Sequence, residues 1–268
     1  MATDAGCDRM SWRQNFRNGL EIMECAEFNT DRVIQAVSTV AASNMALHTG
    51  DDRETVVERR SAFLTACQLP LERLVTALQV HGTAVQAVAS RHAGAGAFSV
   101  DDAIPDTDAL VTNETGLILA IFTADCYPVF IYDPVTPAVG LAHAGWRGTI
   151  GGIAVKTLTT MSAHYGTRPE DCLVTFGPAI CGHCFHVGPE VAVQFAGYAD
   201  ALRAEQSGAY IDLAEANRLM LTAAGVRPNR IIKSGHCTVC QADRFFSYRR
   251  QRGTIGRLMS IIALKSKY

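Results

Sequence analysis

Three side chains that could bind a transition metal are His81, Cys126 and His143, and each follows a segment of strand-like sequence. Imidazole nitrogens and a cysteine thiolate are suitable zinc ligands, and a catalytic zinc keeps three protein ligands with a fourth position open for water. The candidate ligands are separated by 45 and 17 residues, which does not fit a zinc finger. On spacing alone a second interpretation stays open, in which they are a surface histidine, an inert buried thiol and a core histidine.

The elements that must position these ligands follow from hydrophobic patterning. Residues 71–80 have the pattern of a strand that ends at His81, and residues 116–123 form a continuous apolar run typical of a strand buried on both faces. Residues 138–142 form a further strand pattern directly before His143. Because functional side chains gather where a rigid strand ends at solvent, we expect the candidate ligands at such ends.

The rest of the chain alternates between helix and strand patterns. An Asp-Asp pair precedes a capped helix over residues 54–66, and the composition of residues 91–106 indicates a surface loop. The other expected helices and strands are 149–164 and 211–224, and 129–132, 172–176, 231–234 and 258–264. This pattern predicts a single α/β domain with mixed β-sheets flanked by helices over residues 28–268, after a poorly specified N-terminal arm over residues 1–27.

Composition and charge limit the classes of partner. Lys and Arg number 24 against 26 Asp and Glu, so the net charge of −2 points neither to nucleic acid nor to an anionic membrane. The longest apolar runs, such as residues 117–122, are far shorter than a membrane span of roughly 18 or more residues. The first 30 residues carry acidic side chains and lack the apolar stretch of a signal peptide. We therefore expect a cytoplasmic protein, and its odd count of nine cysteines argues against a disulfide scaffold.

Two C-x-x-C motifs, Cys181 to Cys184 and Cys237 to Cys240, could together supply four thiolates to a structural metal site. The gap of 52 residues between them far exceeds the roughly 15–20 residues of a zinc ribbon. Histidines close enough in sequence to join such a site are His183, His186 and His236. The long gap favours partly buried free thiols beside a turn, and whether the motifs bind anything stays open.

A basic and aromatic run spans residues 244–250, with Arg252 and Arg257 beyond it. Its alternation predicts a strand, and arginines at such an edge could bind phosphate or a carboxylate. Arg147 is the better candidate for binding an anion, because it lies four residues after the candidate ligand His143.

Taken together, these motifs resemble the laccase-domain family, whose members were first described as polyphenol oxidases. The resemblance runs from residue 28 to residue 264, nearly the whole chain. The words that carry it, in the family's order, are Leu-His-Thr-Gly-Asp-Asp (47–52), Gln-Val-His-Gly (79–82), Asp-Ala-Leu-Val-Thr (108–112), Thr-Ala-Asp-Cys-Tyr-Pro-Val (123–129), Val-Gly-Leu-Ala-His-Ala-Gly-Trp-Arg-Gly-Thr (139–149), Gly-Pro-Ala-Ile (177–180), Val-Gly-Pro-Glu-Val (187–191) and Phe-Phe-Ser-Tyr-Arg-Arg (245–250).

The resemblance implies a single α/β domain with zinc held by His81, Cys126 and His143, with copper the less favoured metal. Family members are similar to purine nucleoside phosphorylases; they cleave adenosine, inosine, guanosine and methylthioadenosine with phosphate, and they also deaminate adenosine. A bacterial branch is associated with peptidoglycan editing of a cell-wall precursor. The partners implied are purine nucleosides and phosphate, and the oligomeric state stays open.

Further residues take roles beside the metal ligands. Arg60 and Arg147 are hypothetical phosphate anchors. Asp108 is a third candidate for binding substrate, or it could orient a ligand histidine. Asp125 is a candidate catalytic acid or base beside Cys126. If the strand continues, however, the side chains of Asp125 and Cys126 point to opposite faces.

The sequence departs from the family's pattern at three places. The family's Gly-Gly-Val-Ser reads Gln35-Ala36 followed by Val-Ser, its Asn-Arg reads Arg59-Arg60, and its Tyr-Glu-Val has Phe185 and His186 in the first two positions. A lost Gly-Gly turn and a Glu replaced by His could reshape the pocket. These departures affect the choice of substrate and leave the three candidate metal ligands in place.

Three other hypotheses compete with a zinc phosphorylase and deaminase. Cys126 and His143 could form the nucleophile and base of a metal-free amide hydrolase. A polyphenol oxidase with several copper ions is disfavoured, because the eight histidines include no His-x-His pair. A binding protein that kept the fold without activity is the non-enzymatic alternative.

Overall fold

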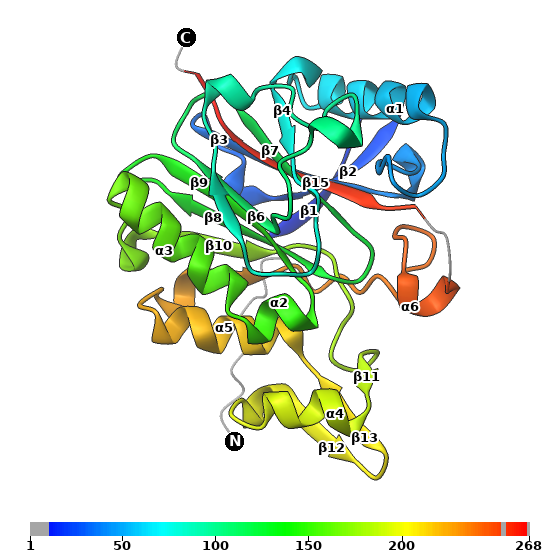
Figure 1. The fold of residues 1–268 in the computed structure, drawn as a ribbon, viewed down its shortest axis with the longest axis vertical. Coiled ribbons are helices and arrows are strands. Elements are labelled where there is room, and N and C mark those ends of the chain that lie inside the picture. The colour runs from blue at the N-terminus through cyan, green and yellow to red at the C-terminus, as the bar shows by residue number, and fades with distance from the viewer. Residues whose placement is uncertain (1–10, 253–255, 267–268) are drawn as a thin grey trace, which may run out of the picture.

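The computed structural model describes residues 11–252 and 256–266, and two six-stranded sheets stack face to face at its centre (Figure 1). The pairs of the first sheet are antiparallel except β4 with β7, so the sheet is mixed. Its strands, in order across the sheet, are β1 Trp12–Arg17, β2 Leu20–Cys25, β3 Val33–Ser38, β15 Leu258–Leu264, β7 Ile118–Thr123 and β4 Leu74–Thr76.

The second sheet is also mixed, with parallel pairs at both edges, β10 with β14 and β5 with β6. Its order is β14 Ile231–Lys233, β10 Leu173–Phe176, β8 Tyr127–Asp133, β9 Ala138–Ala144, β6 Ala109–Thr112 and β5 Val85–Ala87. A third, small sheet projects below the two large ones in Figure 1 and consists of β11 His186–Val187, β13 Gly208–Ile211 and β12 Leu202–Glu205.

Side chains that alternate along each strand divide the apolar residues among three cores. In β15, Leu258 and Ile262 pack between the two sheets, whereas Met259 and Ile261 pack beneath helix α1 Arg53–Ala66. On the outer face of the second sheet, a third core lies under α3 Ile153–Tyr165 and α5 Leu213–Ala223. The result is a four-layer arrangement of helix, sheet, sheet and helices, which confirms the predicted mixed sheets flanked by helices.

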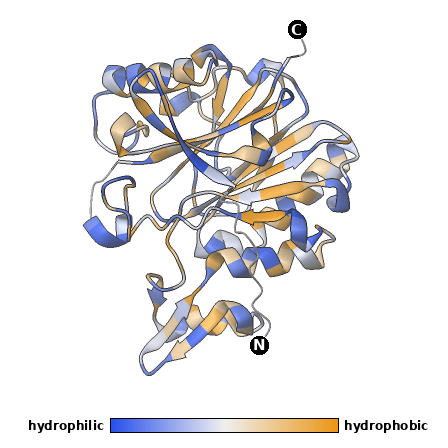
Figure 2. Ribbon diagram, turned by 180° about the vertical axis from the view of Figure 1, so that it is seen from behind, coloured by the Kyte–Doolittle hydropathy of each residue, from blue (hydrophilic) through white to orange (hydrophobic). Residues whose placement is uncertain are grey.

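The remaining helices are short: α2 Trp146–Ile150, α4 Pro189–Ala192 and α6 Tyr248–Gln251. Figure 2 shows hydrophobic colour concentrated in the strands of the two large sheets, with hydrophilic residues along the outer surfaces of the helices. Among the described residues, no helix combines the length and the apolar character needed to cross a bilayer.

The predicted N-terminal arm differs most from the structure. Its first ten residues, including Cys7, lie outside the described residues, but β1 and β2 form a hairpin that belongs to the first sheet. The turn is Asn18-Gly19, with φ of 51° and 78°, which is the Asn-Gly signal of a tight hairpin. Trp12 is buried and donates from Nε1 to Thr175 Oγ1 at 2.8 Å, so the hairpin is fastened to the opposite sheet.

Three further elements differ from the pattern-based prediction. The strand expected over 71–80 shortens to β4, and the helix expected over 149–164 is split into α2 and α3 at Gly152, whose φ is 74°. The prediction of a strand over 244–250 is wrong, because helix α6 begins within this segment. Ser247 caps that helix by accepting a hydrogen bond from the Arg250 amide.

Candidate active site

His81, Cys126 and His143 converge on one point between strand ends. Their ligand atoms all lie within 4.8 Å of one another, although the three residues come from distant parts of the chain. His143 is in β9 and Cys126 directly precedes β8, and the two strands pair with Pro128 opposite His143. His81 lies in a turn beyond β4, and its ring meets that of His143 edge to face at 4.7 Å between centroids.

Asp108 fastens both histidines through one buried carboxylate. Its Oδ1 lies 2.8 Å from His143 Nδ1 and accepts from the His81 amide at 3.0 Å. Its Oδ2 accepts from the amides of Val80 at 3.2 Å and Gly82 at 2.7 Å. Asp108 is fully buried, and its contact with Nδ1 fixes the orientation of the His143 ring and leaves the other ring nitrogen for a metal.

The charges of the cluster favour a thiolate at Cys126. Burial disfavours the charged thiol, but the charge of His143 and hydrogen bonds from His143 and His81 outweigh it and lower the pKa of Cys126 to about 6. Burial likewise lowers the pKa of His143, but Cys126 and Asp108 raise it overall. Because zinc binds the thiolate form of cysteine, the donor set fits a metal ion held by two imidazoles and one sulfur.

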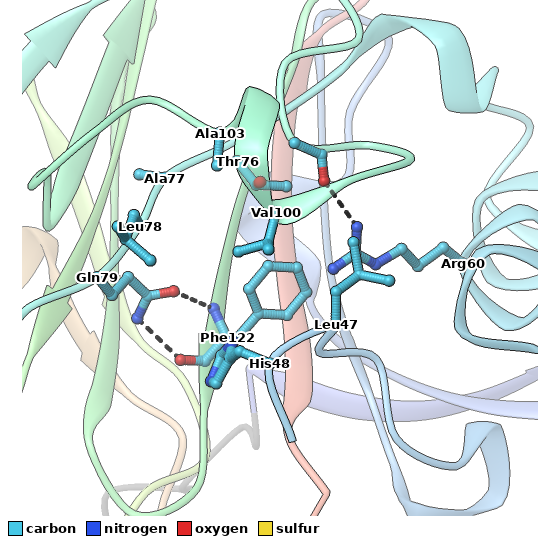
Figure 3. Close-up of a pocket in the computed structure, with 11 residues that line it drawn as sticks. Leu47, His48, Arg60, Thr76, Ala77, Leu78, Gln79, Val100, Ala103 and Phe122 are labelled. Carbon is cyan, nitrogen blue, oxygen red and sulfur yellow. Dashed lines mark hydrogen bonds between the residues drawn. The ribbon is translucent and has the colours of Figure 1, made fainter. Parts of the chain in front are cut away.

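Two backbone conformations support the ligand loops. His81 has φ of 58° and Asp125 has φ of 94°, a region that side-chain-bearing residues rarely adopt and that often marks a functional site. The loop with His81 is held by Gln79, whose side chain accepts from the Phe122 amide at 2.7 Å and donates to the Phe122 carbonyl at 2.9 Å. Gln79 therefore docks this loop on the end of β7, as Figure 3 shows.

Asp125 has both carboxylate oxygens engaged within the protein. Oδ1 accepts from Thr238 Oγ1 and Oδ2 accepts from the Arg249 amide, each at 2.6 Å. Its positive φ turns the chain out of the strand, and the side chain lines the same cavity as Cys126. This arrangement fits a residue that holds the Cys126 loop in place.

A cavity of about 720 Å³ opens over the three ligands. This volume is in the range of small-molecule sites, roughly 300–1,000 Å³. Its wall includes aromatic side chains and charged or titratable groups: Phe122, Trp146, Phe185 and Tyr248, and His48, Arg147, His186, Glu190, Arg249 and Arg257.

Arg60 is not brought to this cavity. It comes from α1, is almost fully buried, and lines a separate cavity of about 180 Å³ (Figure 3). Its guanidinium donates to the carbonyls of Met45, Gly96 and Ala97 at 2.7 to 2.9 Å and stacks over the Phe122 ring at 4.6 Å. The side chain therefore ties α1 to two loops through these backbone carbonyls.

Three arginines do line the large cavity. Arg147, at the start of α2, stacks over Trp146 at 4.2 Å and is exposed. Arg249 donates to the His186 carbonyl at 2.7 Å. Burial lowers the pKa of Arg257, while the nearby charge of Cys126 acts in the opposite direction. The basic and aromatic run thus contributes Arg249 to the cavity from the short helix α6. The strand-like alternation of the run does not indicate that Arg249 and Arg257 line the cavity.

The departures from the family pattern fall in different places. Gln35 and Ala36 lie in β3, and neither residue lines the large cavity. The Oε1 atom of Gln35 accepts a hydrogen bond from the Cys25 amide at 2.8 Å. Phe185 and His186 do line it, and His186 meets the Tyr210 ring edge to face at 5.0 Å. The effect on the pocket is therefore expected at His186.

Gly145 supplies a testable steric requirement of the site. A Cβ at this position would stand 2.9 Å from Cys126 Sγ and 3.2 Å from His81 Cδ2, while its φ of −72° suits any residue. We expect Gly145→Ala to push the ligands apart and to weaken metal binding about tenfold or more, or about 1.4 kcal/mol. Competition with a chromogenic chelator measures this loss. Gly197→Ala is the matched control, since a Cβ there meets nothing within 4 Å, and equal chelator curves for the two variants would contradict the prediction.

Comparison with known proteins places the chain among relatives that cover most of its length. It is 41% identical over 241 residues to the purine nucleoside phosphorylase YlmD of Geobacillus stearothermophilus, covering 85% of each chain. It is 33% identical to the adenosine deaminase RL5 of an unknown prokaryotic organism, covering 94% of this chain and 97% of that one. The crystal structure of YlmD from Geobacillus stearothermophilus superimposes with a TM-score of 0.89 over 96% of this chain and 99% of the other, at 36% identity. The family described as multi-copper polyphenol oxidoreductase laccase matches residues 28–265, and the chain belongs to that family.

Proposed function

We propose that this protein is a zinc-dependent purine nucleoside phosphorylase that also deaminates adenosine and accepts methylthioadenosine. The observation that carries the proposal is the convergence of His81, Cys126 and His143 at the base of a cavity lined by aromatic and basic side chains. The relatives named purine nucleoside phosphorylase and adenosine deaminase support the same reading of the site.

Zinc is the metal that the donor set favours. Two imidazoles and one thiolate leave a fourth position open toward the cavity, as in catalytic zinc sites. Zinc bound there would supply a Lewis acid and a water of lowered pKa. Among the described residues, the other group of three or more clustered metal-ligating side chains consists of four cysteines and no histidine, so the several histidines of a multicopper oxidase are not gathered anywhere in the described chain.

The residues of the cavity divide the work of binding. Phe122 and Phe185 offer apolar faces for a purine ring. Arg147, Arg249 and Arg257 supply the positive charge that phosphate requires, and they would stabilise the charge that develops as the glycosidic bond breaks. Asp108 and Asp125 keep the ligand loops in place beneath the substrate.

The proposal is tested by incubating purified, metal-replete protein with adenosine, inosine, guanosine or methylthioadenosine and phosphate. Chromatography then follows the free base, ribose 1-phosphate and inosine formed from adenosine. We expect phosphate-dependent release of base and phosphate-independent deamination. Absence of turnover on all four nucleosides would refute the proposal.

Arg147 is expected to bind phosphate and to have no part in metal binding. A hydrogen bond to a charged group contributes about 1.5–3 kcal/mol, so Arg147→Ala should raise the KM for phosphate by roughly ten- to a hundredfold. Metal content and deamination of adenosine, which uses no phosphate, should stay near wild type. Arg53→Ala, an exposed arginine of α1 away from the cavity, is the control. A fall in deamination that matches the fall in phosphorolysis would argue against this role.

Metal analysis distinguishes the alternative hypothesis of a metal-free cysteine hydrolase from the zinc-dependent enzyme proposed above. The short approach of Cys126 to His143 would also suit a nucleophile and its base. That mechanism requires activity in chelator-treated protein and a covalent adduct at Cys126. We expect neither, because chelation should abolish turnover and added zinc should restore it.

A further inference from the structure

The two C-x-x-C motifs meet in space in spite of the long segment between them. The sulfur atoms of Cys181, Cys184, Cys237 and Cys240 all lie within 4.8 Å of one another. All eight described cysteines are free, and the four that cluster here are neither part of the active site nor buried in a hydrophobic core as a group. Cys237 is buried, Cys240 is exposed and the other two are partly covered.

The spacing of the sulfur atoms fits a tetrahedral metal site better than a disulfide. Cys184 Sγ and Cys240 Sγ are 3.5 Å apart, far beyond a disulfide bond of about 2.05 Å. Four sulfurs at about 2.3 Å from one zinc would be separated from each other by roughly 3.8 Å. The distances between the four sulfur atoms are therefore close to those around a single tetrahedral ion.

The backbone holds the two loops in register. Ala179 and Cys237 form a parallel bridge, in which the Ala179 amide donates to the His236 carbonyl at 3.2 Å and the Thr238 amide donates to the Ala179 carbonyl at 3.0 Å. Both motifs then turn back on themselves: the Cys184 amide donates to the Cys181 carbonyl at 2.9 Å, and the Gln241 amide donates to the Cys237 carbonyl at 3.0 Å. Pairing between main chains thus brings together thiols that sequence spacing separates.

Backbone amides point at the sulfurs. The Cys181 amide donates to Cys237 Sγ at 3.4 Å, and the amides of Val239 and Cys240 also lie within hydrogen-bonding reach of that sulfur. The His183 amide faces Cys181 Sγ in the same way. Amides that donate to sulfur are hydrogen-bond partners suited to metal-bound thiolates.

We propose that Cys181, Cys184, Cys237 and Cys240 bind one zinc ion in a second, structural metal site. Thiolates are soft ligands that select zinc or iron, and four of them close the coordination sphere, which is the pattern of structural zinc. The site is separate from the His81, Cys126 and His143 cluster and supplies no open position for substrate.

This second site supports the active site through Thr238. Thr238 lies inside the second motif, is fully buried, and donates from Oγ1 to Asp125 at 2.6 Å, directly before Cys126. Arg250 donates to the Thr238 carbonyl at 2.5 Å, and the Ile180 amide, next to Cys181, donates to the Asp125 carbonyl at 2.9 Å. Loss of the ion would therefore loosen one wall of the cavity without removing a catalytic ligand.

The test is metal stoichiometry on the full chain. Wild-type protein purified with zinc should contain two zinc ions, and Cys126→Ala and Cys240→Ser should contain one each. The double variant should contain none, and the control Cys67→Ser, at a buried thiol beside α1, should keep two. Two zinc ions in Cys240→Ser, a single wild-type zinc that Cys126→Ala loses and Cys240→Ser keeps, or iron lost in place of zinc would each overturn the proposal.

A second measurement leaves the four cysteines unchanged. X-ray absorption at the zinc edge of Cys126→Ala protein should show a single shell of four sulfurs at about 2.3 Å. Nitrogen or oxygen in that shell would overturn the proposal, as would a Cys184–Cys240 disulfide found by mass spectrometry of unreduced wild-type protein. Neither measurement depends on nucleoside turnover, so the second site can fail while the proposed function stands.

Discussion

Replacing Cys126 with alanine is expected to remove the active-site metal and to lower phosphorolysis by about 10³-fold, which corresponds to about 4 kcal/mol of lost transition-state stabilisation. Cys126 provides the only sulfur of the three clustered ligands, and its thiolate is already favoured by two histidines. With two imidazoles left, the site can no longer hold the ion against a chelator. Zinc analysis and turnover of inosine measure the two effects together.

The matched control for this change is Cys67→Ala. Cys67 is a buried free thiol that directly follows α1 and packs in the core under that helix, and burial raises the pKa of that thiol to about 12. Its replacement should cost stability through a small cavity while metal content and turnover stay near wild type. Retention of turnover in Cys126→Ala would contradict the assigned role, whatever its stability.

Replacing Asp108 with asparagine is expected to produce the second-largest effect. The carboxylate holds the ring of His143 and accepts three backbone amides of the His81 turn, and an amide group can satisfy only part of this set. Loss of such an orienting partner typically costs 10- to 100-fold in metal affinity or activity, and each donor left unpaired costs about 1–3 kcal/mol of stability. We expect weaker zinc binding together with a lower melting temperature.

Asp133→Asn separates the two parts of this prediction. Asp133 is equally buried, and its Oδ1 accepts from the amides of Val135 and Thr136 in the turn after β8, away from the cavity. Its replacement should lower the melting temperature and leave zinc affinity unchanged. If both variants lose stability and neither loses zinc affinity, Asp108 has no part in orienting the ligands.

The positions of the candidate metal ligands could be read from the sequence, because strand patterns and family motifs mark the places where His81, Cys126 and His143 occur. Their meeting point could not, because it depends on the pairing of β8 with β9 and on the docking of Gln79 against β7. The same limit applies to Arg60. This residue matches the arginine of the family's Asn-Arg motif, but its guanidinium donates to backbone carbonyls. Periodicity cannot show which buried polar groups will need such a donor.

The sequence pattern and the structure differ in two places, each for a physical reason. The N-terminal hairpin has an Asn-Gly turn, yet its strands carry polar residues on the exposed side and acquire their burial from the opposite sheet. The run over 244–250 alternates like a strand, but the capping Ser247 and the buried Phe245 favour a helical turn. In the hairpin, tertiary packing overrides the local pattern, whereas over residues 244–250 the serine cap is itself a local signal and favours the helical turn.

The position of β15 in the first sheet has a consequence for synthesis of the chain on the ribosome. β15 is inserted between β3 and β7, so neither neighbour has its full set of partners until residues 258–264 have left the exit tunnel. At about 5–20 residues per second, the interval between residue 123 and residue 258 lasts on the order of ten seconds. During that time the edge of β7 that pairs with β15 is open, and because an open strand edge can pair with other chains, we expect the nascent chain to be most prone to aggregation in this interval.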